Sequence, residues 1–165
     1  MNPNPSDSST PIALALTGAP NFRDLGGHVT AGGRTVRHGR LFRSDHLADL
    51  SPADLALLAS ALGPAPRVID LRGTAEREAA ACAIAGATVH SLPIEPTIVQ
   101  RLAGLLEAGE RLTAETTVAL MQETYRNFVR HNTPRFADLF RHVLDDAPGP
   151  LVFHCTAGKD RTGFA

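Results

Sequence analysis

The sequence predicts one α/β domain with a central, mostly parallel sheet flanked by helices and a small β-rich N-terminal portion. A chain of 165 residues has the usual size of one compact domain with its own core. From Arg67 onward, short apolar runs alternate with helical patterns, which is typical of parallel βα units. In residues 12–45 two glycine pairs interrupt short apolar runs, which favours short strands and hairpins.

The composition argues against several classes of protein. The chain is 43% apolar and 20% charged, as in ordinary globular proteins. Its net charge of -1 argues against a general attraction to nucleic acid. No stretch approaches the roughly 18 consecutive apolar residues of a membrane span, so we expect no integral membrane segment. The N-terminal tail lacks the positive charge of a signal peptide, so we expect a cytoplasmic protein with reduced cysteines, although secretion without a signal stays open.

Residues 1–94 contain a tail and, after the glycine-rich region, four predicted elements. Residues 1–11 are rich in Pro, Asn and Ser and predict a disordered tail, which places the domain at residues 12–165. Ser51-Pro52 predicts the cap and first position of a helix that ends at Gly63. After it we expect a strand over residues 67–71, a helix over 74–86 that opens on a threonine cap, and a strand over 87–94.

The second half continues the alternation of helices and strands. A Thr-x-x-Gln capping box is predicted at residues 97–100. Apolar residues at helical spacing predict a helix over 113–130, and Thr133-Pro134 predicts the cap and first turn of a separate helix to about residue 144. Residues 151–154 predict a buried strand that leads into the polar loop HCTAGKDRTG.

This loop carries residues suited to phosphate chemistry. A loop between a strand and a helix can point successive backbone N–H groups inward, and the helix N-terminus adds partial positive charge, so the layout predicts an anion cradle. The same dipoles stabilise a thiolate at Cys155 and make it a nucleophile. Arg161, six positions later, can hold two phosphoryl oxygens with its planar fork. The Cys-x5-Arg spacing therefore suits in-line attack on a phosphate ester.

Three motifs together resemble one enzyme family. The loop HCTAGKDRTG resembles the His-Cys-x5-Arg-[Ser/Thr] loop of the cysteine-dependent tyrosine and dual-specificity phosphatases. Its Gly-Lys-Asp-Arg form, with NFRDLGG at residues 21–27 and VIDLR at residues 68–72, is similar to the bacterial tyrosine phosphatases that also hydrolyse phosphoinositides. The resemblance implies hydrolysis of phosphotyrosine in proteins, and further of phosphoserine, phosphothreonine or phosphoinositides, through a phosphocysteine intermediate and without a cofactor.

The resemblance also assigns roles within the loop. Cys155 would be the nucleophile, Arg161 the phosphate clamp and Asp160 the general acid. His154 would orient the loop and support the thiolate, and Thr162 would hydrogen-bond the sulfur. The residues in contact with the substrate would be Thr156, Ala157, Gly158, Lys159 and Thr162.

The charges around Asp160 complicate its assignment. Lys159, the only lysine of the chain, and Arg161 flank Asp160 and favour the ionised carboxylate, whereas a general acid must hold a proton. A bound phosphate dianion would offset these cations. Asp70 and Glu95 are the alternative proton donors. The resemblance associates Lys159 with phosphoinositide headgroups as well as phosphotyrosine.

Residues outside the loop have structural alternatives. The resemblance places Arg23 and Asp24 near the active site, but the same residues suit a hairpin with a surface ion pair. Asp70 and Arg72 are either supporting residues or an ion pair at the end of a buried strand. Cys82 is predicted to pack in the core, with a redox partnership with Cys155 as the alternative. The remaining histidines lack ligand-like spacing, so we expect no metal.

The sequence leaves three hypotheses about function. The first is a phosphatase that acts through Cys155 on a phosphorylated protein or a phosphoinositide. The second is a module that binds phosphate or a phosphoinositide without turnover. The third is an enzyme of the rhodanese or arsenate reductase type, which Arg161-Thr162 disfavours.

Since only residues 162–165 remain to form the helix behind the loop, we expect the C-terminal helices of the domain to be missing. The oligomeric state is left open.

Overall fold

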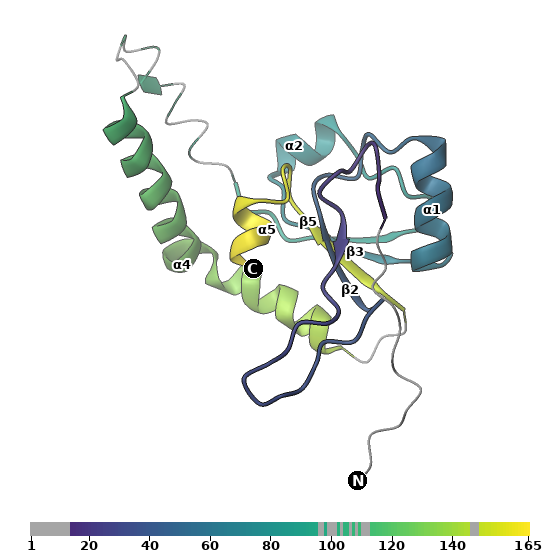
Figure 1. Ribbon diagram of the computed structural model, residues 1–165. Helices are drawn as coiled ribbons and strands as arrows, with labels where there is room; N and C mark the ends of the chain where they lie inside the picture. Colours follow the sequence, from purple (N-terminus) through teal and green to yellow (C-terminus); the bar gives the residue numbers. More distant parts are fainter. Residues whose placement is uncertain are drawn as a thin grey trace.

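The chain folds around one sheet in the computed structural model (Figure 1). The structure describes residues 14–95, 113–145 and 149–165, with positions 98, 102, 104, 105, 107 and 109. The predicted tail at residues 1–11 and both ends of the predicted capping box, Thr97 and Gln100, lie outside the described residues.

The sheet has five strands in the order β1-β2-β5-β3-β4. The strands are β1 (Arg23–Asp24), β2 (Leu41–Ser44), β3 (Arg67–Asp70), β4 (Thr88–Ser91) and β5 (Leu151–His154). The neighbours from β2 to β4 pair in parallel, and only β1 is antiparallel. The predicted mostly parallel sheet is confirmed. The β-rich N-terminal portion supplies one edge of this sheet, and Val29 and Thr35 form a bridge in the hairpin between β1 and β2.

Helix α1 (Pro52–Leu62) begins and ends as predicted. The Ser51 side chain accepts a hydrogen bond from the Asp54 N–H, and Asp54 accepts one from the Ser51 N–H, so the two form a capping box. Asp54 also accepts hydrogen bonds from the N–H groups of Thr17 and Gly18. Backbone hydrogen bonds, from Ser51 first, lower the pKa of Asp54 to about 2.

Helix α2 (Thr74–Ala79) is shorter than predicted. Its N-cap is Gly73 and not Thr74, and the predicted extension to residue 86 is wrong. The chain leaves the helix because the Ala83 N–H donates to the Leu47 carbonyl at 2.8 Å. Cys82 packs against the core beside Ala83, so tertiary contacts outweigh the helical propensity of this alanine-rich segment.

The two helices predicted over residues 113–144 are one helix, α4 (Ala114–Leu144), with Pro134 inside it. Thr133 does not cap a new helix, because its hydroxyl donates to the Val129 carbonyl at 2.5 Å. Pro134 removes one backbone hydrogen bond, and α4 bends near its middle (Figure 1). Phe128 and Phe136, on either side of the proline, pack into the same core cluster, which keeps the helix continuous.

The sheet lies between helices on its two faces (Figure 1). On one face, α1 packs Leu58 and Leu62 onto Phe42, Val68 and Val152. On the other face, α4 packs Phe128, Phe136 and Leu139 onto Ile69, Leu151 and Phe153. Adjacent strand residues therefore face opposite layers, as the pleat requires. The polar loop leaves β5 at the carboxyl edge of this sheet, where parallel α/β folds place their sites.

Candidate active site

The loop after β5 is held by its backbone carbonyl groups. Four successive carbonyls accept hydrogen bonds from the surrounding protein: Cys155 from His154 Nδ1 (3.1 Å), Thr156 from the His46 N–H (3.0 Å), Ala157 from Asn21 Nδ2 (2.9 Å) and Gly158 from Arg43 Nη2 (2.6 Å). All four carbonyls therefore point away from the interior of the loop.

The orientation of the carbonyls fixes the orientation of the backbone N–H groups. In a planar trans peptide the C=O of one residue and the N–H of the next point in opposite directions. The N–H groups of residues 156–159 therefore face the interior of the loop, and none of them donates to a described residue. Four N–H groups that face one interior are suited to bind an anion, and the loop pattern predicts such a cradle.

Gly158 is required at the turn of the loop for two reasons. Its φ of +63° is in the left-handed region that favours glycine. A Cβ at this position would lie 2.5 Å from the Ser44 carbonyl oxygen at the end of β2, so a side chain would collide with backbone. The close approach of the loop to β2 is what places the Gly158 carbonyl within reach of Arg43.

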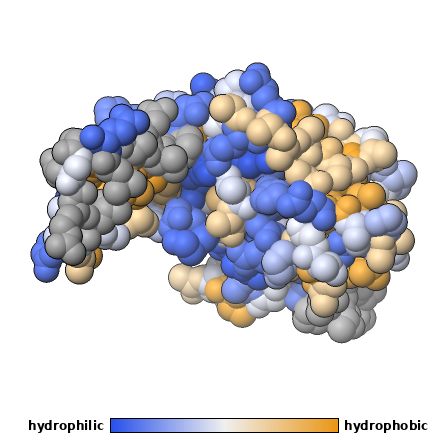
Figure 2. Space-filling model, turned by 90° about the horizontal axis from the view of Figure 1, so that it is seen from above, coloured by the Kyte–Doolittle hydropathy of each residue, from blue (hydrophilic) through white to orange (hydrophobic). Residues whose placement is uncertain are grey.

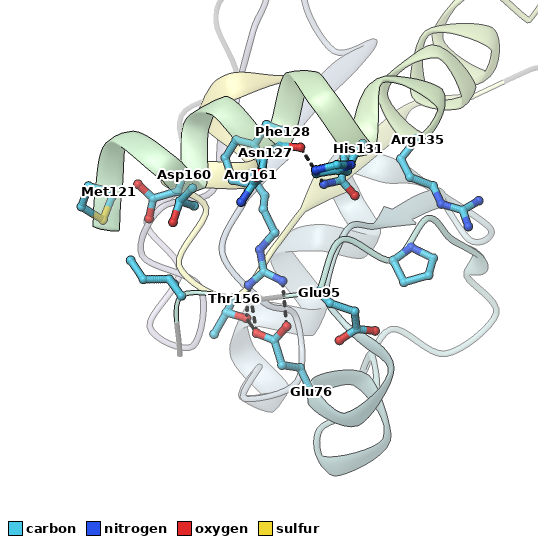
Figure 3. A pocket seen from close by; sticks show the side chains of 14 residues that line it. Glu76, Glu95, Met121, Asn127, Phe128, His131, Arg135, Thr156, Asp160 and Arg161 are labelled. Atoms are coloured by element: carbon cyan, nitrogen blue, oxygen red, sulfur yellow. Dashed lines mark hydrogen bonds and ion pairs between the residues drawn. The ribbon is translucent and has the colours of Figure 1, made fainter. Parts of the chain in front are cut away.

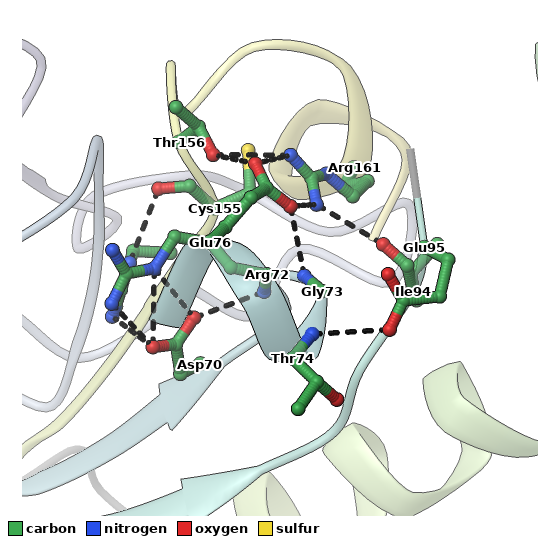
Figure 4. Close-up of polar contacts among 11 residues, drawn as sticks. Asp70, Arg72, Gly73, Thr74, Glu76, Ile94, Glu95, Cys155, Thr156 and Arg161 are labelled. Atoms are coloured by element: carbon green, nitrogen blue, oxygen red, sulfur yellow. Dashed lines mark hydrogen bonds and ion pairs between the residues drawn. The ribbon is translucent and has the colours of Figure 1, made fainter. Parts of the chain in front are cut away.

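Arg161 is held by Glu76 of α2. Its Nη1 and Nη2 donate to the two carboxylate oxygens of Glu76 at 2.7 and 2.9 Å (Figure 4), and Nη1 also donates to the Ile94 carbonyl at 3.0 Å. Burial alone would raise the pKa of Glu76, but the hydrogen bonds from Arg161 and Thr156 outweigh it and lower that pKa to about 2. For Arg161, burial opposes the charged form, but Glu76 and then Cys155 raise its pKa. Figure 4 shows the Cys155 sulfur next to this guanidinium, whose orientation is fixed by Glu76.

Cys155 is 2% exposed at the end of β5. Behind it lies a buried cluster of His154, Asp70 and Arg72. Arg72 pairs with Asp70 through Nε (3.0 Å) and Nη2 (2.7 Å), and this pairing holds the pKa of Asp70 below its usual value even though burial would raise it. The carboxylate of Asp70 is therefore paired with Arg72 below the loop. Glu95, the other alternative proton donor, accepts a hydrogen bond from the Thr74 N–H at 3.0 Å and lines the cavity described below.

His154 is neutral in this cluster. Burial lowers its pKa, and the hydrogen bond to the Cys155 carbonyl requires a proton on Nδ1. Its Nε2 lies 3.7 Å from Asp70 Oδ2 and has no hydrogen-bond partner among the described residues. His154 thus contacts the loop at the Cys155 carbonyl.

Asp160 opens the short helix α5 (Asp160–Phe164). Its Oδ1 accepts from Lys159 Nζ at 2.6 Å and from the Tyr125 hydroxyl of α4 at 2.8 Å. Burial would raise the pKa of Asp160, but these two hydrogen bonds and the charges of Lys159 and Arg161 outweigh it and lower that pKa. The carboxyl group is therefore ionised at neutral pH, which is the difficulty anticipated from the sequence.

A short helical turn, α5, forms behind the loop although few residues follow Arg161. The Gly163 N–H donates to the Lys159 carbonyl at 2.8 Å, and Phe164 packs against Phe128 and Phe136 with ring centroids 5.3 and 5.0 Å away. Tertiary packing thus offsets the cost of nucleation. Thr162 is buried, and its Oγ1 has no hydrogen-bond partner in the described part of the chain. The hydrogen bond expected from Thr162 to the sulfur is not formed.

The residues of the NFRDLGG motif divide between the loop and the hairpin. Arg23 Nη1 donates to the Asn21 carbonyl at 2.9 Å, and Asn21 in turn supports the Ala157 carbonyl. Asp24 instead accepts from the N–H groups of Gly26 (2.8 Å) and Gly39 (2.9 Å), so it closes the hairpin between β1 and β2. Arg23 therefore contacts the loop only through Asn21, and Asp24 stabilises the hairpin.

A cavity of about 590 Å³ opens beside the loop. Figure 3 shows α4 along one wall, with Asp160 near its Met121 end and Arg135 at the other end. From beside α4, Arg161 extends its guanidinium toward Glu76 and Thr156 on the opposite side. Figure 2 looks onto this end of the molecule and shows hydrophilic side chains gathered across the middle of the face. The cavity gives a ligand held by the loop an adjoining surface with both apolar residues, such as Met121 and Phe128, and polar ones, such as Asn127 and Arg135.

The described residues contain neither a group suited to a metal ion nor a helix suited to cross a membrane. In residues 14–95, 113–145 and 149–165 no group of three His, Cys, Asp or Glu side chains is arranged to hold a metal ion. Within the same part of the chain, no helix combines the length and apolar character needed to cross a bilayer.

Comparison with known proteins identifies the family. A family model described as the tyrosine phosphatase family matches residues 14–165. The chain belongs to the tyrosine phosphatase family. The resemblance inferred from the three motifs is confirmed, and the match includes both the loop and the strands that carry it.

Three similar proteins carry phosphatase names. A Cupriavidus necator protein, named as a tyrosine-protein phosphatase, is 39% identical over 157 residues, covering 92% of this chain and 54% of that protein. The triple specificity protein phosphatase PtpB of Mycobacterium tuberculosis is 36% identical over 171 residues, covering 90% and 59%. A tyrosine-protein phosphatase of Nostoc commune is 44% identical over 42 residues, covering 26% and 14%. The chain thus spans between half and three fifths of the length of the first two.

Four residues that contact the loop or its side chains were not predicted from the sequence. Glu76 is 85 positions from the arginine it holds, and its place in the first turn of a predicted helix indicated only an acid favoured by the helix dipole. Asn21 and Arg43 lie in quoted or nearby motifs, but nothing in the spacing shows that they bind loop carbonyls. Tyr125 belongs to an apolar stripe that predicts core packing. It is the only tyrosine of the chain, which is the one available signal.

Proposed function

We propose that the protein hydrolyses phosphate monoesters through a phosphocysteine intermediate on Cys155. One observation carries the proposal: four inward backbone N–H groups, the Cys155 sulfur and the Arg161 guanidinium meet in one loop. Such a cradle binds a phosphoryl group through its non-bridging oxygens. The nucleophile lies at the base of the cradle, as in-line attack requires.

In the first step the Cys155 sulfur attacks phosphorus and the ester P–O bond breaks. Arg161 and the loop N–H groups stabilise the charge that develops on the equatorial oxygens. Glu76 prevents the guanidinium from rotating, because it holds both terminal nitrogens. Asp160 gives its proton to the departing oxygen, so the alcohol or phenol leaves neutral.

In the second step water attacks the phosphocysteine. Asp160, now ionised, takes a proton from that water, the S–P bond breaks and inorganic phosphate leaves. The lowered pKa of Asp160 suits this second role in the free protein. For the first role, the dianionic phosphate of the substrate counteracts the neighbouring cations and raises the proton affinity of the carboxyl group.

We infer that the substrates are phosphotyrosine in proteins, with phosphoserine, phosphothreonine and phosphoinositides as further candidates. The family and the names of the relatives support phosphotyrosine. Lys159, whose side chain is 69% exposed beside the loop, provides a second cation for a substrate with additional phosphate groups. A cytoplasmic location stays a prediction.

The test is turnover of an aryl phosphate by the complete gene product and by its Cys155→Ser variant. We expect the variant to lose turnover and the parent protein to be inhibited by vanadate. Unchanged activity in Cys155→Ser would disprove the mechanism. Tight binding of phosphate by the parent protein without detectable product would instead support the module that binds without turnover.

A further inference from the structure

The two carboxylate oxygens of Asp160 have different surroundings. Oδ1 accepts both the Tyr125 hydroxyl at 2.8 Å and the Lys159 ammonium at 2.6 Å. Oδ2 accepts no hydrogen bond from any residue that the structure describes. A proton on the carboxyl group would compete with two donors at Oδ1 but with none at Oδ2.

The Tyr125 hydroxyl is held in place from a different element. Tyr125 lies on α4, whereas Asp160 opens α5. The Tyr125 ring meets Phe128 edge-on with centroids 5.4 Å apart, and its centroid lies 6.3 Å from that of Phe164 in α5. These aromatic contacts restrict the ring, which is 38% exposed, and so favour the donor position that the hydroxyl takes here.

This inference rests on the proposed function, in which Asp160 is the general acid. We propose that Tyr125 is a positioning residue: it holds Oδ1 of Asp160, so that Oδ2 carries the proton that is transferred. Lys159 also binds Oδ1, but its flexible side chain is exposed and starts from the neighbouring residue. Among the residues that the structure describes, only Tyr125 holds the carboxyl group from another helix.

The proton balance follows from this assignment. When the S–P bond forms and the ester bond breaks, the proton on Oδ2 passes to the leaving oxygen, and the carboxylate keeps its hydrogen bonds at Oδ1. When water attacks the phosphocysteine, Oδ2 takes one proton from that water and phosphate departs. Tyr125 keeps its own proton in both steps, and its hydrogen bond to Asp160 raises the pKa of the phenol.

The charged groups facing Asp160 give the direction of the pH effect. The charged groups are Lys159 and Arg161 from its own segment, and α4 adds the uncharged but titratable hydroxyl of Tyr125. The Tyr125 hydrogen bond stabilises the carboxylate and therefore lowers the pKa of Asp160. Tyr125→Phe removes this hydrogen bond, so activity that requires protonated Asp160 should persist to higher pH.

The experiment measures kcat over a series of phosphate esters with leaving groups of increasing pKa, in the complete gene product and in Tyr125→Phe. Phenylalanine retains the ring contacts. General acid catalysis contributes roughly 10²- to 10⁴-fold, and it matters most for a basic leaving group. We expect Tyr125→Phe to lower kcat about 10-fold for an alkyl phosphate and less than about 2-fold for an aryl phosphate with an acidic phenol. The basic limb of the pH profile should move to higher pH.

Asp160→Asn and the double variant Tyr125→Phe/Asp160→Asn are the matched controls. If Tyr125 acts through Asp160, the double variant should be no slower than Asp160→Asn alone. An equal loss for every ester, an additive loss in the double variant or an unmoved pH profile would each overturn the proposal. If Asp160→Asn leaves the leaving-group dependence unchanged, Asp160 is not the acid and this proposal fails, while the role of Cys155 is judged separately by Cys155→Ser.

Discussion

At the scale of single residues, the loop depends on donors from distant parts of the chain. Its carbonyls are held by Asn21, Arg43 and His46, and its arginine is held by Glu76. These contacts turn the N–H groups inward and fix the guanidinium before a ligand arrives. Such preorganisation is worth most where charge develops in a transition state.

Gly158→Ala should damage the loop more than its backbone angle alone explains. A left-handed φ costs a non-glycine residue about 1–2 kcal/mol, and here the added Cβ would also lie 2.5 Å from the Ser44 carbonyl oxygen. We expect a loss of unfolding free energy of about 2 kcal/mol or more, with loss of phosphatase activity. Urea unfolding and turnover of an aryl phosphate measure the two effects.

Gly33→Ala is the control for this prediction. Gly33 has a φ of +77°, yet a Cβ there would meet nothing within 4 Å. Gly33→Ala should lower the free energy of unfolding only by the cost of the left-handed φ, about 1–2 kcal/mol, and leave activity intact. Equal behaviour of the two variants would show that the contact with β2 is unimportant.

The sequence predicts the residues of the loop well and their supports poorly. The loop is contiguous, so the spacing between Cys155 and Arg161 can be interpreted directly. Glu76 becomes part of the site only because β3 and β5 are neighbours, which brings the start of α2 to the loop. Long-range contacts of this kind leave no periodic signal in a single sequence.

At the scale of elements, α5 is a five-residue helix stabilised by aromatic contacts with α4. Phe164 lies close to Phe128, Phe136 and Tyr125, and it joins the helix of the loop to the wall of the cavity. Local propensity alone does not account for this helix, because so short a segment does not nucleate on its own.

Phe164→Ala should therefore loosen α5 and the loop together. Removal of a fully buried phenylalanine costs about 3–5 kcal/mol, and since Phe164 is 39% exposed we expect a smaller loss, near 2 kcal/mol. Phosphate affinity should fall as well. Phe140→Ala is the control, because Phe140 lies on α4 and is 52% exposed; its effect should stay within about 0.5 kcal/mol. Equal losses would argue against the coupling of α5 to α4.

The errors at this scale have physical causes. Thr133-Pro134 is a sound signal for a helix start, but Phe128 and Phe136 pack on one core and hold α4 together across the proline. The alanine-rich segment after α2 is a sound helical pattern, but the hydrogen bond from Ala83 to Leu47 draws it to the core. In both places tertiary packing outweighs local preference.

At the scale of the whole molecule, the fold class was predictable and the strand order was not. Alternation of strands and helices along the sequence indicates parallel pairing. The position of β5 between β2 and β3 depends instead on which strand order buries the most apolar surface on the two faces of the sheet. That central position gives the loop neighbours on both sides, β2 with Arg43 and β3 with the buried Asp70–Arg72 pair.

The ion pair between α2 and the loop should make stability depend on pH. The pKa of Glu76 falls from 4.5 to about 2 on folding. A lowered folded-state pKa gives stability that is fully present above about pH 4.5 and is lost as pH falls toward 2. Urea unfolding of the parent protein and Glu76→Gln should therefore show a stability difference at pH 6 that shrinks by pH 3. A constant difference would contradict this.

The most direct test of the proposed chemistry is to trap the intermediate. The complete gene product should be mixed with an aryl phosphate, quenched in acid during turnover and analysed by peptide mass spectrometry. We predict phosphate on the peptide that contains Cys155, its disappearance when substrate is exhausted, and no such peptide in Cys155→Ser. Steady hydrolysis without phosphate on Cys155, or hydrolysis that persists in Cys155→Ser, would contradict the proposed mechanism.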